Sequence, residues 1–98
     1  MTATESINHV SRDAAGVLRV RGTGYKVIML VGEHVRQGWD AEEMHRQHPD
    51  LTLGQIHSVL SYYYDHVEEL REELATRERK AEVLLRELDR AGILRTLH

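Results

Sequence analysis

Cysteine is absent from the 98 residues of this chain. Its absence excludes a disulfide framework, a thiolate metal site and a cysteine nucleophile, and it suits a reducing compartment. The sequence also lacks any apolar run near the roughly 20 residues of a membrane span, and residues 1–13 contain no apolar segment typical of a signal peptide. We therefore expect a soluble, cytoplasmic protein that has no membrane partner.

Positive charge is also scarce, because 13 Lys and Arg residues are set against 16 Asp and Glu, for a formal net charge of −3. This balance excludes a uniformly basic nucleic-acid binder, so any contact with DNA must come from a local patch. The chain has the length of one domain, and a chain this short buries only a modest core unless it associates. Oligomerisation is therefore an expectation from length alone.

Proline occurs once, and it separates two signals for the start of a helix. At the first, Asp40 can cap the amide of Glu43, whose side chain can reach back to complete a capping box. At the second, Thr52 and Gln55 form the same pair. Between them, Pro49 pushes the residue before it out of the helical region and ends the first of these helices. The apolar pairs expected to staple the two starts are Trp39 with Met44, and Leu51 with Ile56.

These two starts predict a short helix over residues 40–48, a tight turn and a longer helix, which is helix-turn-helix geometry. An earlier helix is expected over 27–37, where apolar residues have helical spacing and Gly38 provides a C-terminal stop. Before it, residues 17–21 alternate apolar and charged side chains, a Gly-Thr-Gly turn follows, and 25–27 resume the pattern. We predict a short hairpin, or a strand and turn, there. Residues 1–15 are polar and small, which is typical of a flexible arm or a marginal edge strand.

Glycine and proline are both missing from Gln55 to Ala91, which predicts one long third helix. Such a helix spans about 55 Å, whereas a compact domain of this size has a radius of gyration of about 13 Å. Its second half must therefore overhang the body. The alternative is a break near Ala75 and Thr76 that folds residues 77–91 back as a fourth helix.

Apolar residues recur along this helix at steps of three and four, and only Arg77 interrupts the series. An overhanging heptad seam lacks cover within the chain, so we expect a homodimer or a higher homo-oligomer, or another protein, to supply it. In a parallel pair, Glu73 would face Glu78 and Lys80 would face Leu85, so an antiparallel pair or a different partner fits better. The predicted interface residues are Tyr63, Val67, Leu70, Leu74, Ala81, Leu84 and Leu88.

Four segments carry a resemblance to a known family: Gly16 to Thr23, Gly38 to Glu43, His48 to Thr52, and Ser61-Tyr62-Tyr63. Over about residues 7–66, the chain resembles the bacterial family called domain of unknown function 433. The resemblance implies a short β segment followed by three helices of the helix-turn-helix class. It also implies an antitoxin of the VapB type, often paired with a PIN-like ribonuclease toxin. Gly24 and Lys26 depart from the family pattern, which often has an arginine and a proline at those places.

We therefore predict a mainly α protein with a three-helix, homeodomain-like helix-turn-helix core, a short N-terminal β arm and a long C-terminal helix. The expected parts are a flexible arm over 1–15, the strand and helix-turn-helix domain over 16–66, and the heptad helix with its tail over 67–98. The last part exceeds the usual family core, so its purpose is not inherited. Acidic residues outnumber basic ones between Glu68 and Arg90, and the apolar tail residues Ile93, Leu94 and Leu97 suit docking in a groove.

The start of the last helix of a helix-turn-helix lies in the major groove of DNA. In this chain the outward positions there hold no Arg or Lys, and the basic residues of the first third occupy the hairpin region and the first helix instead. DNA binding would then take its phosphate contacts from that region, and the alternative is that these are ordinary solvated positions. The candidate DNA-binding residues are Arg19, Arg21, Lys26, Gln55, His57 and Ser58.

Metal and catalytic chemistry have little support in the sequence. His45 and His48 lie three residues apart, but no acidic or sulfur ligand completes a known spacing. Ser61, Asp65 and His66 lie on one expected helix, without a nucleophile elbow or an oxyanion loop. We expect no metal, no cofactor and no enzymatic activity.

The expected function is that of an antitoxin, which binds a PIN-like ribonuclease toxin and its own operator DNA. The alternative is a homo-oligomeric scaffold or adaptor without DNA binding, which the uncharged recognition face and the acidic balance favour. The run Tyr62-Tyr63-Tyr64 either helps to close an interface or packs within one chain.

Overall fold

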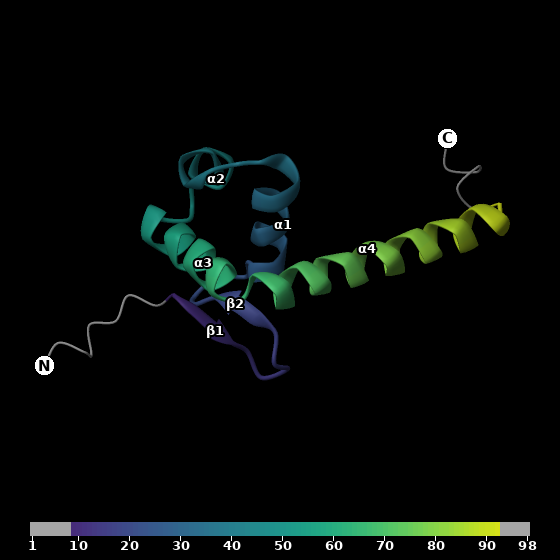
Figure 1. Cartoon of the computed structure of the whole chain (residues 1–98), viewed down its shortest axis with the longest axis horizontal. Helices are drawn as coiled ribbons and strands as arrows, with labels where there is room; N and C mark the ends of the chain where they lie inside the picture. Colours follow the sequence, from purple (N-terminus) through teal and green to yellow (C-terminus); the bar gives the residue numbers. More distant parts are fainter. Residues whose placement is uncertain (1–8, 93–98) are drawn as a thin grey trace, which may run out of the picture.

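The computed structural model describes residues 9–92 and shows a helical body from which one helix projects (Figure 1). The expected docking tail at Ile93, Leu94 and Leu97 lies outside the described residues. The mainly α class with a short β segment is confirmed. In chain order the elements are β1 (Val10–Arg12), β2 (Leu18–Val20), α1 (Val27–Gln37), α2 (Ala41–Gln47), α3 (Leu53–Asp65) and α4 (Val67–Arg90).

The two strands form an antiparallel hairpin in which Val10 lies opposite Val20. Asp13 closes its turn, because one carboxylate oxygen accepts two turn amides at 2.9 and 3.0 Å and the other accepts Arg19 Nε at 2.7 Å. Residues 10–12, expected in a flexible arm or a marginal edge strand, form a strand, as the second alternative predicts. They replace residues 25–27 as the partner of the predicted strand. The reason is that the chain enters α1 at residue 27, so only one bridge, between Arg19 and Lys26, remains of the expected pairing.

Helices α1 and α2 begin and end where local signals predict. Gly38 ends α1 in the left-handed region with φ 72°, and its amide donates to His34 O at 3.2 Å. The Asp40 side chain caps α2 by accepting the Glu43 amide at 2.9 Å. The expected reciprocal bond of Glu43 is replaced by contacts within the helix. Its carboxylate accepts from the side chains of Gln47 and Arg46, which hold the pKa of Glu43 below its usual range.

Helix α3 begins with the complete capping box that the sequence predicts. Thr52 Oγ1 accepts the Gln55 amide at 3.0 Å, and Gln55 Oε1 accepts the Thr52 amide at 2.8 Å. Leu51 before the cap and Ile56 within the helix are both buried, as expected for a hydrophobic staple.

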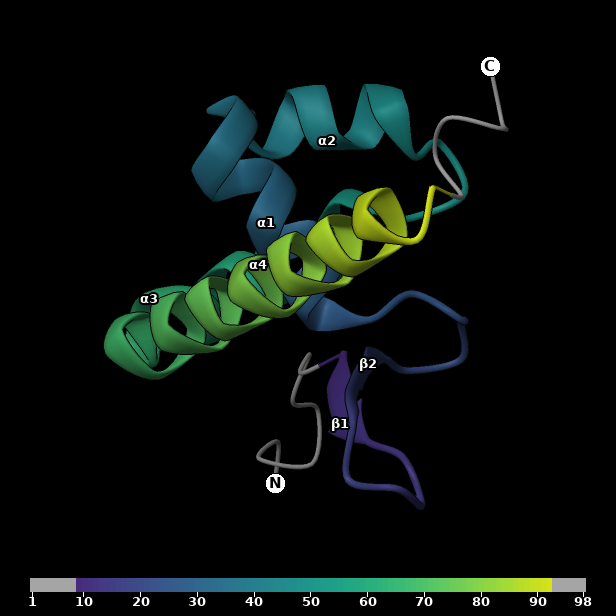
Figure 2. The same ribbon diagram turned by 90° about the vertical axis from the view of Figure 1, so that its right-hand side faces the viewer.

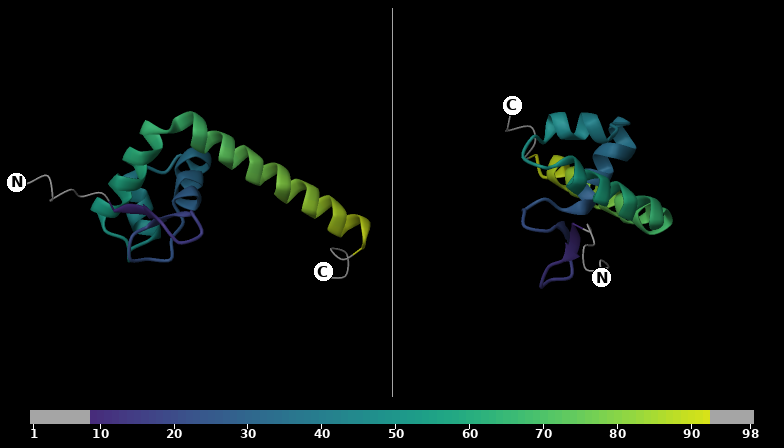
Figure 3. Two further views of the ribbon diagram at one scale, coloured as in Figure 1. Left: turned by 90° about the horizontal axis from the view of Figure 1, so that it is seen from below. Right: turned by 90° about the vertical axis from the view of Figure 1, so that its left-hand side faces the viewer.

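The third helix does not run on to Ala91, as its lack of glycine and proline predicted. It ends at Asp65, and His66 leaves the helical region with φ −137° and ψ 43° before α4 begins at Val67. Figure 3 shows the resulting bend between α3 and α4. A fourth helix therefore exists, as in the alternative, but it starts at Val67 and not after a break at Ala75 and Thr76, and residues 77–90 project from the body instead of folding back on it.

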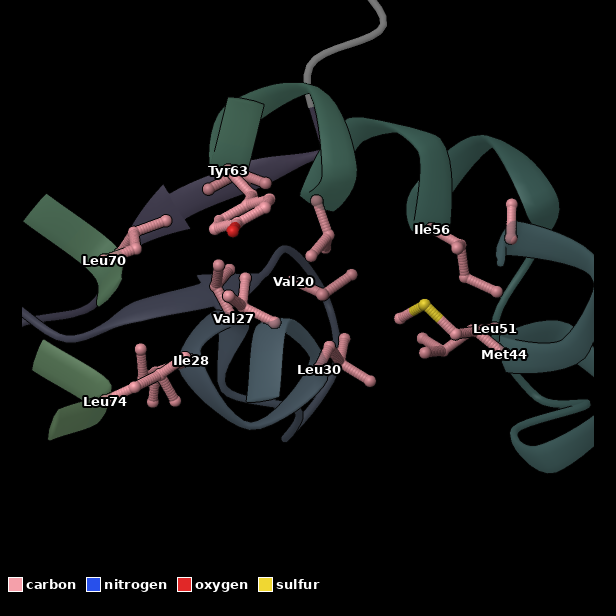
Figure 4. Packing of buried hydrophobic residues seen from close by; sticks show 14 residues of the cluster. Val20, Val27, Ile28, Leu30, Met44, Leu51, Ile56, Tyr63, Leu70 and Leu74 are labelled. Carbon is pink, nitrogen blue, oxygen red and sulfur yellow. The ribbon is translucent and has the colours of Figure 1, made fainter. Parts of the chain in front are cut away.

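One apolar cluster supplies the core, and every strand and helix contributes to it (Figure 4). At one end of the cluster, Met44 and Leu51 pack near Ile56. At the other, Leu70 and Leu74 of α4 lie beside α1 and the ring of Tyr63. Burial of each large apolar side chain stabilises the fold by about 1.5 to 3 kcal/mol before ordering costs. Packing of α4 against α1 explains the bend, because a straight continuation of α3 would carry these two leucines away from the core.

Helix α4 divides into a covered half and a free half. Its first three turns pack on α1, and Arg36 Nε of α1 forms an ion pair with Glu78 at 2.9 Å near the end of this contact. Beyond it, α4 extends away from the body (Figures 1 and 2). The molecule therefore measures 61 × 27 × 23 Å, and the predicted overhang is present, although it belongs to a separate helix.

Candidate interaction surfaces

Two histidines fix the turn between α2 and α3 in place. His45 Nδ1 lies 2.7 Å from Leu51 O, and His48 Nε2 lies 2.8 Å from the Glu33 carboxylate of α1. Both imidazoles are half-buried. Sequence reasoning considered them only as metal ligands, although a histidine in the last turn of a helix commonly bonds the exposed carbonyls there. Their role in the structure is to hold the α2–turn–α3 unit against α1.

Further polar contacts connect segments of the body that follow different helices. The Tyr25 hydroxyl donates to the Asp50 carboxylate at 3.0 Å, and this bond raises the pKa of Tyr25. His34 bridges two segments, with Nδ1 2.7 Å from Trp39 O and Nε2 2.7 Å from the Tyr64 hydroxyl. These contacts make the body one unit, so a surface on α3 has a fixed orientation relative to α1 and the hairpin.

The predicted reading face of α3 offers few free polar groups. His57 is exposed and Ser58 is half-buried, while the Gln55 carbonyl is already used in the capping box. No Arg or Lys occurs in residues 53–65. The face therefore lacks the side chains that bind phosphate or guanine most strongly.

The predicted cations differ in their availability. Arg19 is engaged, because Nε pairs with Asp13 and Nη1 donates to Gly24 O at 2.9 Å. Lys26 is half-buried at the N-cap of α1, beside a polar hollow between the hairpin and α4. Arg21 is exposed. Of the three, Arg21 is the one best placed to meet an external anion.

His9 links the hairpin to the start of α3, which the sequence did not indicate. The Arg21 amide donates to His9 O at 2.7 Å, and the His9 ring lies against Gly54, where an added Cβ would sit 3.6 Å from Nε2. The backbone at Arg21 is thus connected to the first turn of α3 through His9.

The predicted oligomer seam is split between the core and the free half of α4. Tyr63 and Leu70 are only 2% exposed, and Leu74 is also buried. Val67 packs half-buried against the same cluster. These four residues are therefore wrong as members of an interface with another chain, because the bend at His66 folds them into their own domain. Of the other predicted members, Ala81 and Leu84 are exposed, and Leu88 is partly exposed.

The tyrosine run packs within one chain in this structure. Tyr63 accepts a hydrogen bond from Arg71 Nε at 2.9 Å, and Tyr62 stacks on His66 with ring centroids 4.1 Å apart. Tyr64 bonds His34 while its ring stays largely exposed. The alternative of internal packing is therefore the one that the described contacts support.

The free half of α4 exposes three large apolar side chains in succession. Val83, Leu84 and Leu85 are 50%, 56% and 52% exposed. Successive residues of a helix point about 100° apart, so Val83 and Leu85 lie on opposite sides of Leu84. A shallow groove beside Val83 is lined by Thr76, Arg79, Lys80, Val83, Leu84 and Glu87. Heptad spacing missed Val83 and Leu85 because it selects only one stripe of the helix.

Within residues 9–92, no group of three or more His, Asp or Glu side chains is arranged to hold a metal ion. The described helices include none with the length and apolar character needed to cross a membrane. The candidate surfaces among the described residues are the outward side of α3 and the free half of α4.

The structure thus defines a small, mainly helical domain with a β hairpin and a projecting helix. The profile of the family described as Protein of unknown function (DUF433) matches residues 10–63. The chain belongs to this family. The match covers β1 to the last turn of α3, so α4 lies outside it. No curated protein and no solved structure matches the chain.

Proposed function

We propose that this protein is an antitoxin-type regulator that captures a partner protein on the free half of α4. The observation that carries the proposal is the exposure of Val83, Leu84 and Leu85 on a helix that projects from the body. A helix that is apolar on more than one side is normally covered by its surroundings. Clusters of exposed apolar residues mark protein–protein contacts when polar residues border them.

Charge is divided unevenly along α4. Residues 68–78 hold five acidic and two basic side chains, whereas the free half, residues 79–90, holds three acidic and four basic ones. The acidic excess that would attract a basic partner therefore lies beside the apolar residues of the free half, on the covered half, where Glu78 is already paired with Arg36 of the body. A ribonuclease that handles RNA presents such a basic surface, which agrees with the PIN-like toxin implied by the family resemblance.

We include in the proposal that α2, the turn and α3 act as a helix-turn-helix that contacts operator DNA. The support is the turn between two capped helices and the link that His9 makes between the Arg21 backbone and the first turn of α3. Because α3 has no cation of its own, phosphate contacts must come from Arg21 and its neighbours. Binding should therefore be weak and should depend steeply on salt.

Co-purification with the product of the neighbouring toxin gene tests the capture of a partner. The informative truncation ends after Glu78, because it removes the free half of α4 and keeps both buried leucines of the covered half. We expect the full chain to retain the toxin and to neutralise it in cells, and the truncated chain to do neither. Val83→Glu should weaken capture, whereas Met29→Glu, an equally exposed apolar site on α1, should leave it intact. Full neutralisation by the truncated chain would contradict the proposal.

A homo-oligomeric scaffold without DNA binding is the second candidate. The observation that favours it is that Arg19 is bound within the hairpin and that residues 53–65 contain no cation. Gel retardation of the promoter fragment at low salt separates the two. Retardation that Arg21→Glu abolishes supports DNA binding, and its absence at about 50 mM salt supports the scaffold.

A further inference from the structure

One apolar stripe of α4 begins under α1 and continues bare along the free half. Leu70 and Leu74 occupy this stripe where α1 covers it, and Ala81, Leu84 and Leu88 continue it at steps of three and four. Arg36 pairs with Glu78 at 2.9 Å, and α1 ends one residue later, at Gln37. Helix α1 therefore covers only the first part of the stripe, which continues along α4 beyond the end of α1.

We infer that a second copy of this chain covers the free stripe, with the two α4 helices antiparallel and the two-fold axis midway between Ala81 and Leu84. Ala81 of each copy then lies opposite Leu84 of the other, and Arg77 lies opposite Leu88. An antiparallel pair places the two bodies at opposite ends of the overlap. The arrangement is isologous, as required for a closed dimer.

The extent of the free stripe selects this centre. The bare stripe runs from Arg77 to Leu88, so an axis between Ala81 and Leu84 overlaps it completely in both copies. If the two-fold axis lay one helical turn closer to the body, the interface would require Leu74, which is already buried against α1. If the axis lay one turn farther from the body, part of the stripe would stay uncovered. Arg77 at the end of the overlap extends its guanidinium to solvent while its stem covers apolar surface.

Charge selects the same register independently. Lys80 and Glu87 lie two turns apart on one edge of the stripe, and both line the groove beside it. In the proposed register, Lys80 of each copy faces Glu87 of the other. The neighbouring registers would place Lys80 against Lys80 or Glu87 against Glu87, and a parallel pair would place Glu73 against Glu78. Such charges at the rim determine orientation and register more than affinity.

The dimer is expected to be weak, because the overlap is short. About 12 residues of each helix, or about 18 Å, form the contact. The buried area then falls below the roughly 1,200 Å² of a standard interface, which corresponds to a transient association. Val83 points away from the stripe and stays free for a different partner. The pairing is a property of the chain alone and does not depend on the antitoxin proposal.

Sedimentation equilibrium of the full chain alone provides the first test. We expect a monomer–dimer equilibrium with a dissociation constant of about 10 to 100 µM. Leu84→Glu should weaken association by about tenfold or more, while Val83→Glu, the adjacent and equally exposed residue, should change it less than about twofold. A monomer at about 500 µM, or equal effects of the two substitutions, overturns the inference.

A charge swap tests the register. Lys80→Glu and Glu87→Lys should each weaken dimerisation by about two- to fivefold at low salt. The chain that carries both substitutions should recover, because each new glutamate again faces a new lysine. Additive weakening in the double variant overturns the register.

The relative orientation of the two α4 helices can be tested separately by disulfide cross-linking, because the chain contains no cysteine of its own. On oxidation, a mixture of Ala81→Cys and Leu84→Cys chains should form mainly the mixed disulfide dimer. Each variant alone should cross-link poorly. Efficient cross-linking within each variant, with none between them, indicates a parallel pair and overturns the antiparallel arrangement. Circular dichroism confirms that every variant keeps its helices.

Discussion

The two halves of α4 carry the same heptad spacing and have opposite surroundings. In the covered half, Leu70 is 2% exposed against α1, whereas Leu84 in the free half is 56% exposed. Both residues occupy the same stripe of the helix. The spacing therefore identifies a face that needs cover, and the tertiary fold decides whether the cover comes from the same chain or from another.

The difference also separates two roles within one helix. The covered half completes the core of the domain, although it lies outside the residues that match the family profile. A domain boundary placed at residue 66 would divide the core from two of its buried leucines. The free half contributes nothing to the core and is available for binding. Substitutions in α4 before Glu78 should therefore affect the stability of the domain, whereas substitutions after it should affect binding.

The largest expected effect comes from truncations on either side of that point. A chain that ends after His66 loses Leu70 and Leu74, each worth about 2 to 5 kcal/mol, against a total stability of about 5 to 15 kcal/mol for a small domain. We expect it to be unfolded or molten. A chain that ends after Glu78 should keep a cooperative thermal transition near that of the full chain. Thermal melts of the two chains, followed by circular dichroism, measure the difference. Similar melts would contradict the assignment of only the first half of α4 to the core.

Single substitutions sharpen the comparison at matched positions on the stripe. Leu70→Ala should lower the free energy of unfolding by about 2 to 5 kcal/mol through loss of burial and the cavity left behind. Leu84→Ala should change it by less than about 0.5 kcal/mol at concentrations where the chain is monomeric. Urea titrations at about 1 µM protein provide the measurement. A large cost for Leu84→Ala under these conditions would show that the free half is covered within the chain.

Local features of the body could be predicted from the sequence because their partners lie within four residues. The caps at Asp40 and Thr52 and the stop at Gly38 each depend on contacts with adjacent turns. The break at His66 could not be predicted from the sequence, because no local signal marks it. It results from competition between a continuous helix and the burial of distant leucines on α1. The pairing of residues 10–12 with β2 was missed for a similar reason, since a strand partner is not local.

The candidate surfaces show the same division. Sequence patterns identified Arg21, His57 and Leu84 as exposed candidates, and the structure leaves all three exposed. They did not indicate that His9 connects the Arg21 backbone to α3, because His9 and Gly54 lie far apart in the sequence. They placed Leu70 and Leu84 in one interface, although the fold assigns the first to the core. The spacing of apolar residues does not show whether the same chain or another one covers the apolar face of a helix.

A moderate effect, confined to the body, is expected from the helix caps. Thr52→Ala removes one acceptor of the capping box and should cost about 1 kcal/mol, with Thr52→Ser retaining most of the stability. Because the cap lies far from the free half of α4, sedimentation should show the same dimerisation as for the unchanged chain. Chemical denaturation measures the first expectation. A simultaneous loss of dimerisation would mean that the two regions are coupled, contrary to their separate roles.

The smallest expected effect is a pH dependence in the hairpin. The hydrogen bond from Arg19 and those from the turn amides hold the pKa of Asp13 below the usual range of an aspartate. A pKa that is lower in the folded state stabilises the fold above the unfolded value, and this contribution disappears as the pH falls through the folded value. Asp13→Asn keeps an oxygen for the turn amides and removes the charge. Its urea midpoint should therefore lie below that of the parent at pH 7 and approach it as the pH falls through the lowered pKa of Asp13. In an Arg19→Met background the same substitution should have a smaller effect at pH 7, because the main cause of the lowered pKa is gone. A difference that persists unchanged at low pH would show that Asp13 acts through turn geometry and not through its charge.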